Sequence, residues 1–211
     1  MLYVMGAGVL ILLLTWRLGW WDSASPPSAA AWPSSVSVGS GLYGPALSIF
    51  PPSQRKPSPS LSGTTLSGAQ FDLASLRGHV VVINVWGSWC GPCRQEAPIL
   101  ARISQQTYGE GVRFVGIDER DHDAAARAFE RAFGINYPSV VDPDGQQLLP
   151  FSQVMPINAI PITLVLDPAG RIAARFVGAV DETTLRGVID YTLAQADPGR
   201  GQGSGGSRGT R

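Results

Sequence analysis

The chain has very few of the residues from which metal sites are built. Its 211 residues include two cysteines and two histidines. A closed zinc site needs four ligands, and His79 and His122 show no ligand spacing, so we expect no metal ion. No other cofactor is indicated. Cys90 and Cys93 therefore serve either redox chemistry or a structural disulfide. A structural disulfide across so short a loop would constrain the unfolded chain very little.

Charge is scarce as well. Charged residues make up 15% of the chain, and 16 basic residues balance 16 acidic ones. This balance gives no reason to expect a nucleic acid as a partner. The glycines and prolines concentrate towards the two ends, which predicts linkers flanking a folded middle.

The two cysteines stand in the motif Trp89-Cys90-Gly91-Pro92-Cys93, directly after the apolar run 80–86. If a helix begins here, its unpaired N–H groups and its dipole favour a thiolate at Cys90. Gly91 lets the chain turn, and Pro92 is tolerated in a first turn that has no N–H partner to lose. The pattern therefore predicts that Cys90 attacks a substrate disulfide and that Cys93 resolves the mixed disulfide.

Two stretches carry a family resemblance. The string 76–98, which contains this motif, and the string 159–167 resemble the two signatures of the TlpA/ResA-like thioredoxins. The resemblance covers roughly residues 54–196. It implies an exported thiol–disulfide oxidoreductase, often tethered to a membrane, that acts on thiols and disulfides of exported proteins. Such an enzyme would draw electrons from a membrane donor.

The resemblance also implies site residues beyond the cysteines. Pro161 matches a cis-proline, so the Ile160–Pro161 peptide would lie opposite the dithiol and pair with an extended substrate. Asn84 stands where cytoplasmic thioredoxins keep a buried acid. Glu96 matches a family glutamate near the active site, and either handles the proton of Cys93 or simply favours the helix dipole in a first turn. Substrate contacts are expected from Trp89, Gly91, Pro92, Ile160 and Pro161, and Trp86 is expected in the core.

The resemblance implies an α/β thioredoxin fold, with a central mixed sheet flanked by helices. Alternating strand and helix patterns agree with it. The 71 residues between Cys90 and Pro161 indicate an inserted strand and helix around 138–155, between the dithiol helix and the cis-proline strand. Asp121 is expected to cap a helix. Asp118 and Glu119 end a strand on the side of the dithiol, which suggests a secondary role there.

Four segments are expected along the chain. Residues 1–21 are almost wholly apolar and long enough to span a bilayer, which predicts a transmembrane anchor with the domain outside the cytoplasm. The alternative is a cleaved signal segment with a cleavage site near Ala29–Ala31, which would give a secreted protein. Residues 22–53 form a linker rich in Ser, Pro and Ala; residues 54–197 form the thioredoxin-like domain; residues 198–211 form a disordered Gly/Ser/Arg tail.

The function expected from these features is reduction of disulfides in exported proteins, with apocytochrome c as the substrate that the resemblance implies. Two alternatives stay open. The protein could oxidise folding proteins, as DsbE-like relatives do, or it could be a non-catalytic module that binds peptides. The intact pair of Cys90 and Cys93 counts against the last alternative, because a simple binding module needs no dithiol.

Overall fold

The fold is built on one mixed sheet that alternates with helices. The computed structural model describes residues 37–38 and 46–196, and the account below concerns these residues. The main sheet has seven strands in the order β1-β2-β9-β8-β5-β6-β7. These strands are β1 (Ser37–Val38), β2 (Ala46–Ile49), β5 (Val80–Trp86), β6 (Val112–Glu119), β7 (Ser139–Asp142), β8 (Ile162–Leu166) and β9 (Ile172–Val177). The neighbours β5, β6 and β7 run parallel and the other neighbouring strands pair antiparallel, so the sheet is mixed, as expected.

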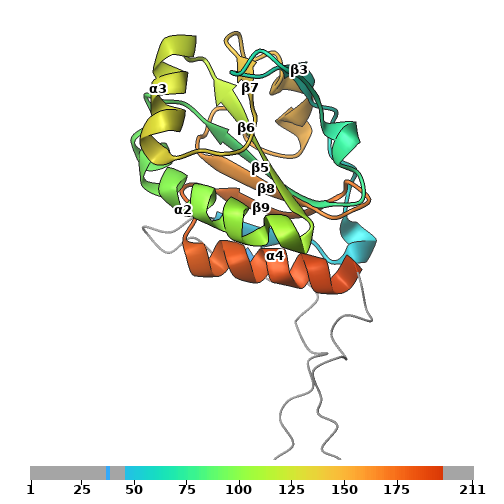
Figure 1. Ribbon diagram of the computed structural model, residues 1–211. Helices are drawn as coiled ribbons and strands as arrows, with labels where there is room; N and C mark the ends of the chain where they lie inside the picture. The colour runs from blue at the N-terminus through green and yellow to red at the C-terminus, as the bar shows by residue number, and fades with distance from the viewer. Residues whose placement is uncertain (1–36, 39–45, 197–211) are drawn as a thin grey trace, which may run out of the picture. The chain divides into compact units, whose positions relative to one another are not determined.

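Three α-helices flank this sheet: α2 (Gly91–Thr107), α3 (Asp123–Phe133) and α4 (Glu182–Ala196). Figure 1 shows α2 and α4 side by side below the strands, with α3 at the upper left. A separate hairpin, β3 (Ser62–Thr64) and β4 (Gln70–Asp72), turns near Gly68, where a positive φ of 86° suits glycine. Short 3-10 helices complete the domain: η1 (Pro52–Gln54), η2 (Leu73–Leu76), η3 (Tyr108–Glu110) and η4 (Leu149–Gln153).

Strand β5 holds the centre of the core. All seven of its residues are buried. Alternate side chains enter different hydrophobic clusters, because successive residues of a strand point to opposite faces. Val80 and Val82 pack with residues of α2 and α4, whereas Val81, Ile83 and Val85 pack with a cluster that includes Phe151. Each buried aliphatic side chain contributes roughly 1.5–3 kcal/mol. This anchoring fixes the end of β5, from which the cysteine motif emerges.

The ordered domain begins earlier than residue 54. Residues 46–49, expected in the linker, form β2 and pair with β9. Leu47 and Ile49 explain the difference, because both pack against the cluster beneath α2 and α4. The last described element, α4, ends at Ala196.

The stretch 138–155 contains β7 and the 3-10 helix η4. Phe151 and Met155 within it are buried in the core. That this stretch is an insertion into a plain thioredoxin remains a prediction.

Within residues 46–196, none of the helices combines the length and the apolar character needed to cross a membrane. The anchor or signal segment expected at 1–21 and the tail expected at 198–211 lie outside the described residues, as does most of the linker.

Candidate active site

The two cysteines lie where β5 gives way to α2. After Trp86, residues 87–89 make a tight turn in which the amide of Cys90 donates to the carbonyl oxygen of Gly87 at 3.0 Å. Cys90 is the N-cap residue of α2, with extended backbone angles. Cys93 lies in the first helical turn, and the two sulfur atoms form a disulfide with Cα atoms 5.3 Å apart. The arrangement is the one that the sequence predicted from the strand–motif–helix order.

The helix N-terminus faces the sulfur of Cys90. The backbone N–H of Cys93 donates to Cys90 Sγ at 3.2 Å. A thiolate formed at Cys90 on reduction would receive this N–H together with the positive end of the helix dipole. Both cysteines are buried in the oxidised protein, whereas the neighbouring Trp89 side chain is 59% exposed. Trp86 is buried and stacks on Phe129 of α3, so the two tryptophans have the different environments that the sequence predicted.

The peptide bond between Ile160 and Pro161 is cis, as the resemblance implies. It immediately precedes β8, which pairs with β5, the strand leading to the cysteines. Ile160 is half-buried and packs against the cluster that contains Cys90 and Cys93. The sheet therefore brings this peptide, distant in sequence, beside the dithiol.

Glu96 and Asn84 form a buried polar pair behind the disulfide. The Asn84 side-chain amide donates to Glu96 Oε1 at 2.8 Å and to Thr163 Oγ1 at 3.1 Å. The backbone N–H of Val180 donates to Glu96 Oε2 at 2.9 Å. Burial raises the pKa of Glu96 from 4.5 to about 7, although these two hydrogen bonds act to lower it. Glu96 can therefore take up or release a proton near neutral pH.

This setting changes the balance between the two interpretations of Glu96. A carboxylate in the first turn would gain from the helix dipole, but α2 has no acid in its first turn, since it starts at Gly91. Glu96 is 1% exposed and three residues beyond Cys93, so the two side chains lie on the same side of the helix. The dipole interpretation therefore loses its basis, and proton handling remains as a proposal.

The space beside Cys93 is dry. It is lined by Asn84, Trp86, Cys93, Ala97, Phe129, Ile135 and Tyr137 and is too narrow to admit a water molecule. The amide of Asn84 cannot accept a proton in the manner of a carboxylate. Exchange of the Cys93 thiol proton with Glu96 is the proposal that this enclosure and the burial of Glu96 support.

Two residues near the site were missed or misassigned by the sequence. Arg94 lies over the ring of Phe133, 5.1 Å from its centre, and donates to the carbonyl oxygen of Ser88 at 3.4 Å. Asp121 does not cap α3, for which His122 is the N-cap residue without a side-chain hydrogen bond. The carboxylate of Asp121 instead accepts from the amide of Ser88 at 2.6 Å and from the amide of His122 at 2.7 Å. An Asp just before a helix predicts an N-cap. The contact with the Ser88 amide becomes evident only from the fold.

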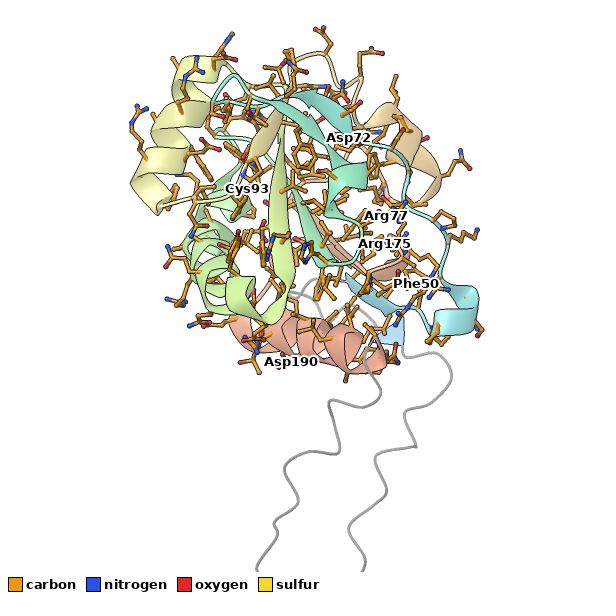
Figure 2. The ribbon with its side chains drawn as sticks, turned by 45° about the vertical axis from the view of Figure 1, so that its right-hand side comes forward. Phe50, Asp72, Arg77, Cys93, Arg175 and Asp190 are labelled. Carbon is orange, nitrogen blue, oxygen red and sulfur yellow. A yellow bond between two sulfur atoms is a disulfide. The ribbon has the colours of Figure 1, made fainter. Side chains whose placement is uncertain are left out.

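Other hollows of the domain lie away from the cysteines. A cavity of about 140 Å³ is lined by residues that include Asp72, Arg77 and His79. In Figure 2, Cys93 lies on the left of the domain and Asp72 and Arg77 lie on the right. His79 is half-buried, with Nδ1 3.2 Å from the carbonyl oxygen of Gly111, and His122 is exposed. Among the described residues, no group of His, Cys, Asp and Glu side chains could hold a metal ion.

Several known proteins are similar to this chain in sequence and in fold. A family model described as Redoxin matches residues 51–191. Thiol-disulfide oxidoreductase ResA of Bacillus subtilis (strain 168) is 29% identical over 119 residues, which are 56% of this chain and 64% of ResA. Thiol:disulfide interchange protein DsbE of Xylella fastidiosa is 30% identical over 196 residues, which are 92% of this chain and 85% of DsbE. This chain thus spans a little under two thirds of ResA and most of DsbE.

A solved structure gives the same result. The crystal structure of a DsbF homologue from Corynebacterium diphtheriae superposes with a TM-score of 0.64 at 33% identity, covering 69% of this chain and 92% of that one. The relatives carry names of thiol–disulfide enzymes, and this chain has a cysteine pair at the N-terminus of a thioredoxin-type helix. The chain therefore belongs to the Redoxin family, among its thiol–disulfide oxidoreductases of the TlpA/ResA type.

Proposed function

We propose that this protein reduces disulfides of exported proteins outside the cytoplasm, with cysteine pairs of apocytochrome c as the substrate class implied by its family. In the reduced protein, the Cys90 thiolate attacks one sulfur of a substrate disulfide, and the other substrate sulfur leaves as a thiol. Cys93 then attacks Cys90 of the mixed disulfide, the substrate leaves fully reduced, and the Cys90–Cys93 disulfide forms. Two electrons pass to the substrate, and a membrane thiol donor must restore the dithiol.

The observation that carries this proposal is the contact at the helix N-terminus. Cys90 Sγ receives the Cys93 N–H, and Gly91 and Pro92 between the cysteines add no further hydrogen-bonding side chain. A strongly oxidising couple requires an unusually stabilised thiolate, whereas the helix terminus alone gives moderate stabilisation. The environment therefore supports a reducing couple.

Substrate docking is proposed at the exposed Trp89 and the cis peptide. Trp89 offers a large amphipathic surface beside Cys90. The backbone of Ile160 lies two residues before the start of β8, so an extended substrate segment could pair there as an added strand. Gly91 and Pro92, the first two residues of α2, are exposed and would contact the substrate next.

The test is the reduction potential of the Cys90–Cys93 couple, measured on the full-length protein against glutathione. We expect roughly −220 to −280 mV, near the thioredoxin value of about −270 mV. A value above about −180 mV, the level of disulfide isomerase, would overturn the reductant proposal. Insulin reduction by the wild type but not by Cys90→Ser would separate an enzyme from a simple peptide-binding module.

One contact favours the oxidant alternative. The Arg94 guanidinium binds the Ser88 carbonyl, two residues before Cys90, and so brings a cation near the nucleophile. A cation stabilises a thiolate and raises the potential of the couple. Arg94 is exposed, however, so solvent weakens its effect. The measured potential decides between the two directions of electron flow.

A further inference from the structure

Two carboxyl groups lie beneath the turn that presents Cys90. Asp118 is near the end of β6, where it is in register with Trp86 of β5, and it is 2% exposed. Asp121 follows three residues later and accepts hydrogen bonds from the amides of Ser88 and His122. Neither group has a part in the exchange chemistry described above.

Asp118 has the properties of a carboxyl group that keeps its proton. Its Oδ1 atom is buried without a hydrogen-bond partner in the described structure. Burial, followed by the nearby carboxylates of Asp121, Glu130 and Asp123, raises the pKa of Asp118 to about 8, and a hydrogen bond with Asp121 acts in the same direction. A buried carboxyl oxygen without a partner favours the neutral form of the group, because burial disfavours the charge. Asp121 already accepts from two backbone amides, which leaves Asp118 as the group of the two that can donate.

We propose that neutral Asp118 is a positioning residue for the dithiol: it donates a hydrogen bond to Asp121 and thereby holds Asp121 against the Ser88 amide, in front of Cys90. This inference rests on the proposed thiol–disulfide chemistry and adds a residue to it. When Asp118 loses its proton, two like charges face each other and the Asp121–Ser88 contact weakens. The turn before Cys90 would then be held less tightly as the pH rises.

The turn is tight enough to transmit such a change to Cys90. A Cβ atom on Gly87 would lie 3.2 Å from the Glu119 carbonyl oxygen, so the chains are already in close contact there. The indole N–H of Trp89 donates to this same oxygen at 3.4 Å, and the amide of Cys90 donates to Gly87. Movement between β6 and residues 87–89 would therefore displace both the exposed Trp89 and the nucleophile.

The pKa of Asp118 should depend on the charged groups that surround it. Glu130 and Asp123 face it from α3, and Asp121 faces it from the loop after β6. Asp123 is paired with Arg127 at 2.9 Å, and Glu119 is 3.4 Å from Arg120. Of these groups, Asp121 alone also contacts the Ser88 amide. Replacing Asp121 should therefore have a larger effect than replacing Asp123 or Glu130.

The experiment is a pH titration of Trp89 fluorescence in oxidised full-length protein, which contains no titrating thiol. The signal of Trp89 is obtained by subtracting the spectrum of Trp89→Phe. We expect a transition with a midpoint near pH 8 in the wild type and none in Asp118→Asn, whose amide imitates the neutral acid. Asp121→Asn removes the second charge and should abolish most of the transition, whereas the matched controls Asp123→Asn and Glu130→Gln should keep it and only shift its midpoint slightly to lower pH.

Activity supplies the second readout. The ratio of kcat/KM of Asp118→Asn to that of wild type should rise by about threefold or more between pH 7 and pH 9, because only the wild type loses its positioning contact. An unchanged ratio, a flat wild-type titration, or a transition that persists in Asp118→Asn would overturn the proposal. If Asp118→Asn fails to fold, a transition that persists in Asp121→Asn with the wild-type amplitude and midpoint would overturn it equally. The titration uses no substrate, so its outcome is independent of whether the protein proves to be a reductant.

Discussion

The side-chain amide of Asn84 donates a hydrogen bond of 2.8 Å to the carboxylate of Glu96 inside the domain, behind the Cys90–Cys93 disulfide. Asn84 on β5 occupies the position at which cytoplasmic thioredoxins keep a buried acid. Here that position carries an amide, and the buried acid, Glu96, lies on α2 instead. Because the carboxyl group is then on the helix that carries Cys93, one element holds both the resolving thiol and its proposed proton partner. This relationship leads to the first two predictions.

Replacing Glu96 by Gln should slow the resolution of a mixed disulfide by at least about tenfold, the low end of general acid–base contributions. The wild-type rate should depend on a group titrating near pH 7, to which burial raises the pKa of Glu96, and the variant should lack this dependence. Stopped-flow resolution of a mixed disulfide at several pH values measures both effects. Glu182→Gln, an exposed glutamate on α4, is the control. A variant with the wild-type pH dependence would show that another group handles the proton.

Glu96 should also make stability depend on pH. Its pKa is higher in the folded protein, about 7, than its ordinary value of 4.5, so the folded state keeps a proton that the unfolded chain releases. The free energy of unfolding should therefore fall as the pH rises from about 4.5 to 7, by at most about 3 kcal/mol from this residue. Urea unfolding at pH 4.5 and pH 8 should show a smaller fall for Glu96→Gln than for wild type. An equal decrease in the free energy of unfolding for the two proteins would show that another group takes up the proton.

Cys90 should be the thiol that reacts in the reduced protein. The helix N-terminus and the Cys93 N–H stabilise its thiolate, whereas Cys93 lies in a dry space. Iodoacetamide at neutral pH should label Cys93→Ser at least about ten times faster than Cys90→Ser, as expected for a thiolate compared with a buried thiol. Peptide mapping of labelled wild type gives an independent reading. Equal labelling of the two positions would contradict the assignment.

Much of this fold could be predicted from the sequence because the patterns that indicate it are local. The apolar run 80–86 and the cysteine motif after it predicted β5 and the start of α2 within a residue, since the strand is buried on both faces and the motif marks the helix N-terminus. Asp181, a residue type that favours helix N-termini, stands just before α4, and its carboxylate accepts from the amide of Thr184. The cis form of Ile160–Pro161 came from the family resemblance and not from the residues themselves.

The failures involve contacts between distant segments. Asp121 carries the residue type of a helix cap, but the amide of Ser88, 33 positions earlier, takes its carboxylate. Residues 46–49 lie between proline-rich stretches and showed no strand pattern, because their pairing with β9 depends on an edge formed more than a hundred residues later. The hydrogen bond from Val180 to Glu96 likewise joins residues that are 84 positions apart in the sequence. Sequence patterns report a residue's own element, whereas these contacts depend on how the elements pack.

A buried ion pair at the opposite end of β8 should matter for stability and not for redox chemistry. Asp167 is 3% exposed and accepts from the Arg171 side chain at 2.9 Å and from Arg55 at 3.3 Å. Burial acts to raise the pKa of Asp167, but the hydrogen bonds from Arg171 and Arg55 outweigh it and lower the pKa below its usual value. Asp167→Asn should reduce the free energy of unfolding by about 2–4 kcal/mol, because it leaves a buried arginine without its charge partner.

The matched control is Asp190→Asn on α4, where Figure 2 labels Asp190. This substitution removes the 2.9 Å contact of a half-exposed carboxylate with Arg186 and should cost less than about 1 kcal/mol. Denaturant unfolding of both variants at pH 7 gives the comparison. Because the folded pKa of Asp167 is lowered, the difference between wild type and Asp167→Asn should shrink as the pH falls below about 4. An equal effect of the two substitutions would mean that burial adds nothing to this pair.

The location of the protein is predicted from residues 1–21. If they anchor the chain, full-length protein should stay with membranes after a carbonate wash, and its mature N-terminus should lie before Asp22. Removing residues 1–21 should release the domain. A soluble product that begins near Ala30 to Trp32 would instead indicate a cleaved signal segment and a secreted protein.

Arg94 should tune the potential of the couple. Its guanidinium is held over Phe133 and against the Ser88 carbonyl, and its charge favours a thiolate at Cys90. Arg94→Gln removes this charge, so the reduced form should lose stability relative to the oxidised form. The potential should become more negative by about 5–20 mV, which corresponds to the 0.3–1 kcal/mol typical of an exposed charge interaction. Arg94→Lys keeps the charge and should retain most of the wild-type potential. Arg102→Gln, further along α2 and paired with Glu182, should leave it unchanged. If Arg94→Lys shifts the potential as far as Arg94→Gln, the packing of the guanidinium on the Phe133 ring is the cause and its charge is not, because lysine preserves only the charge.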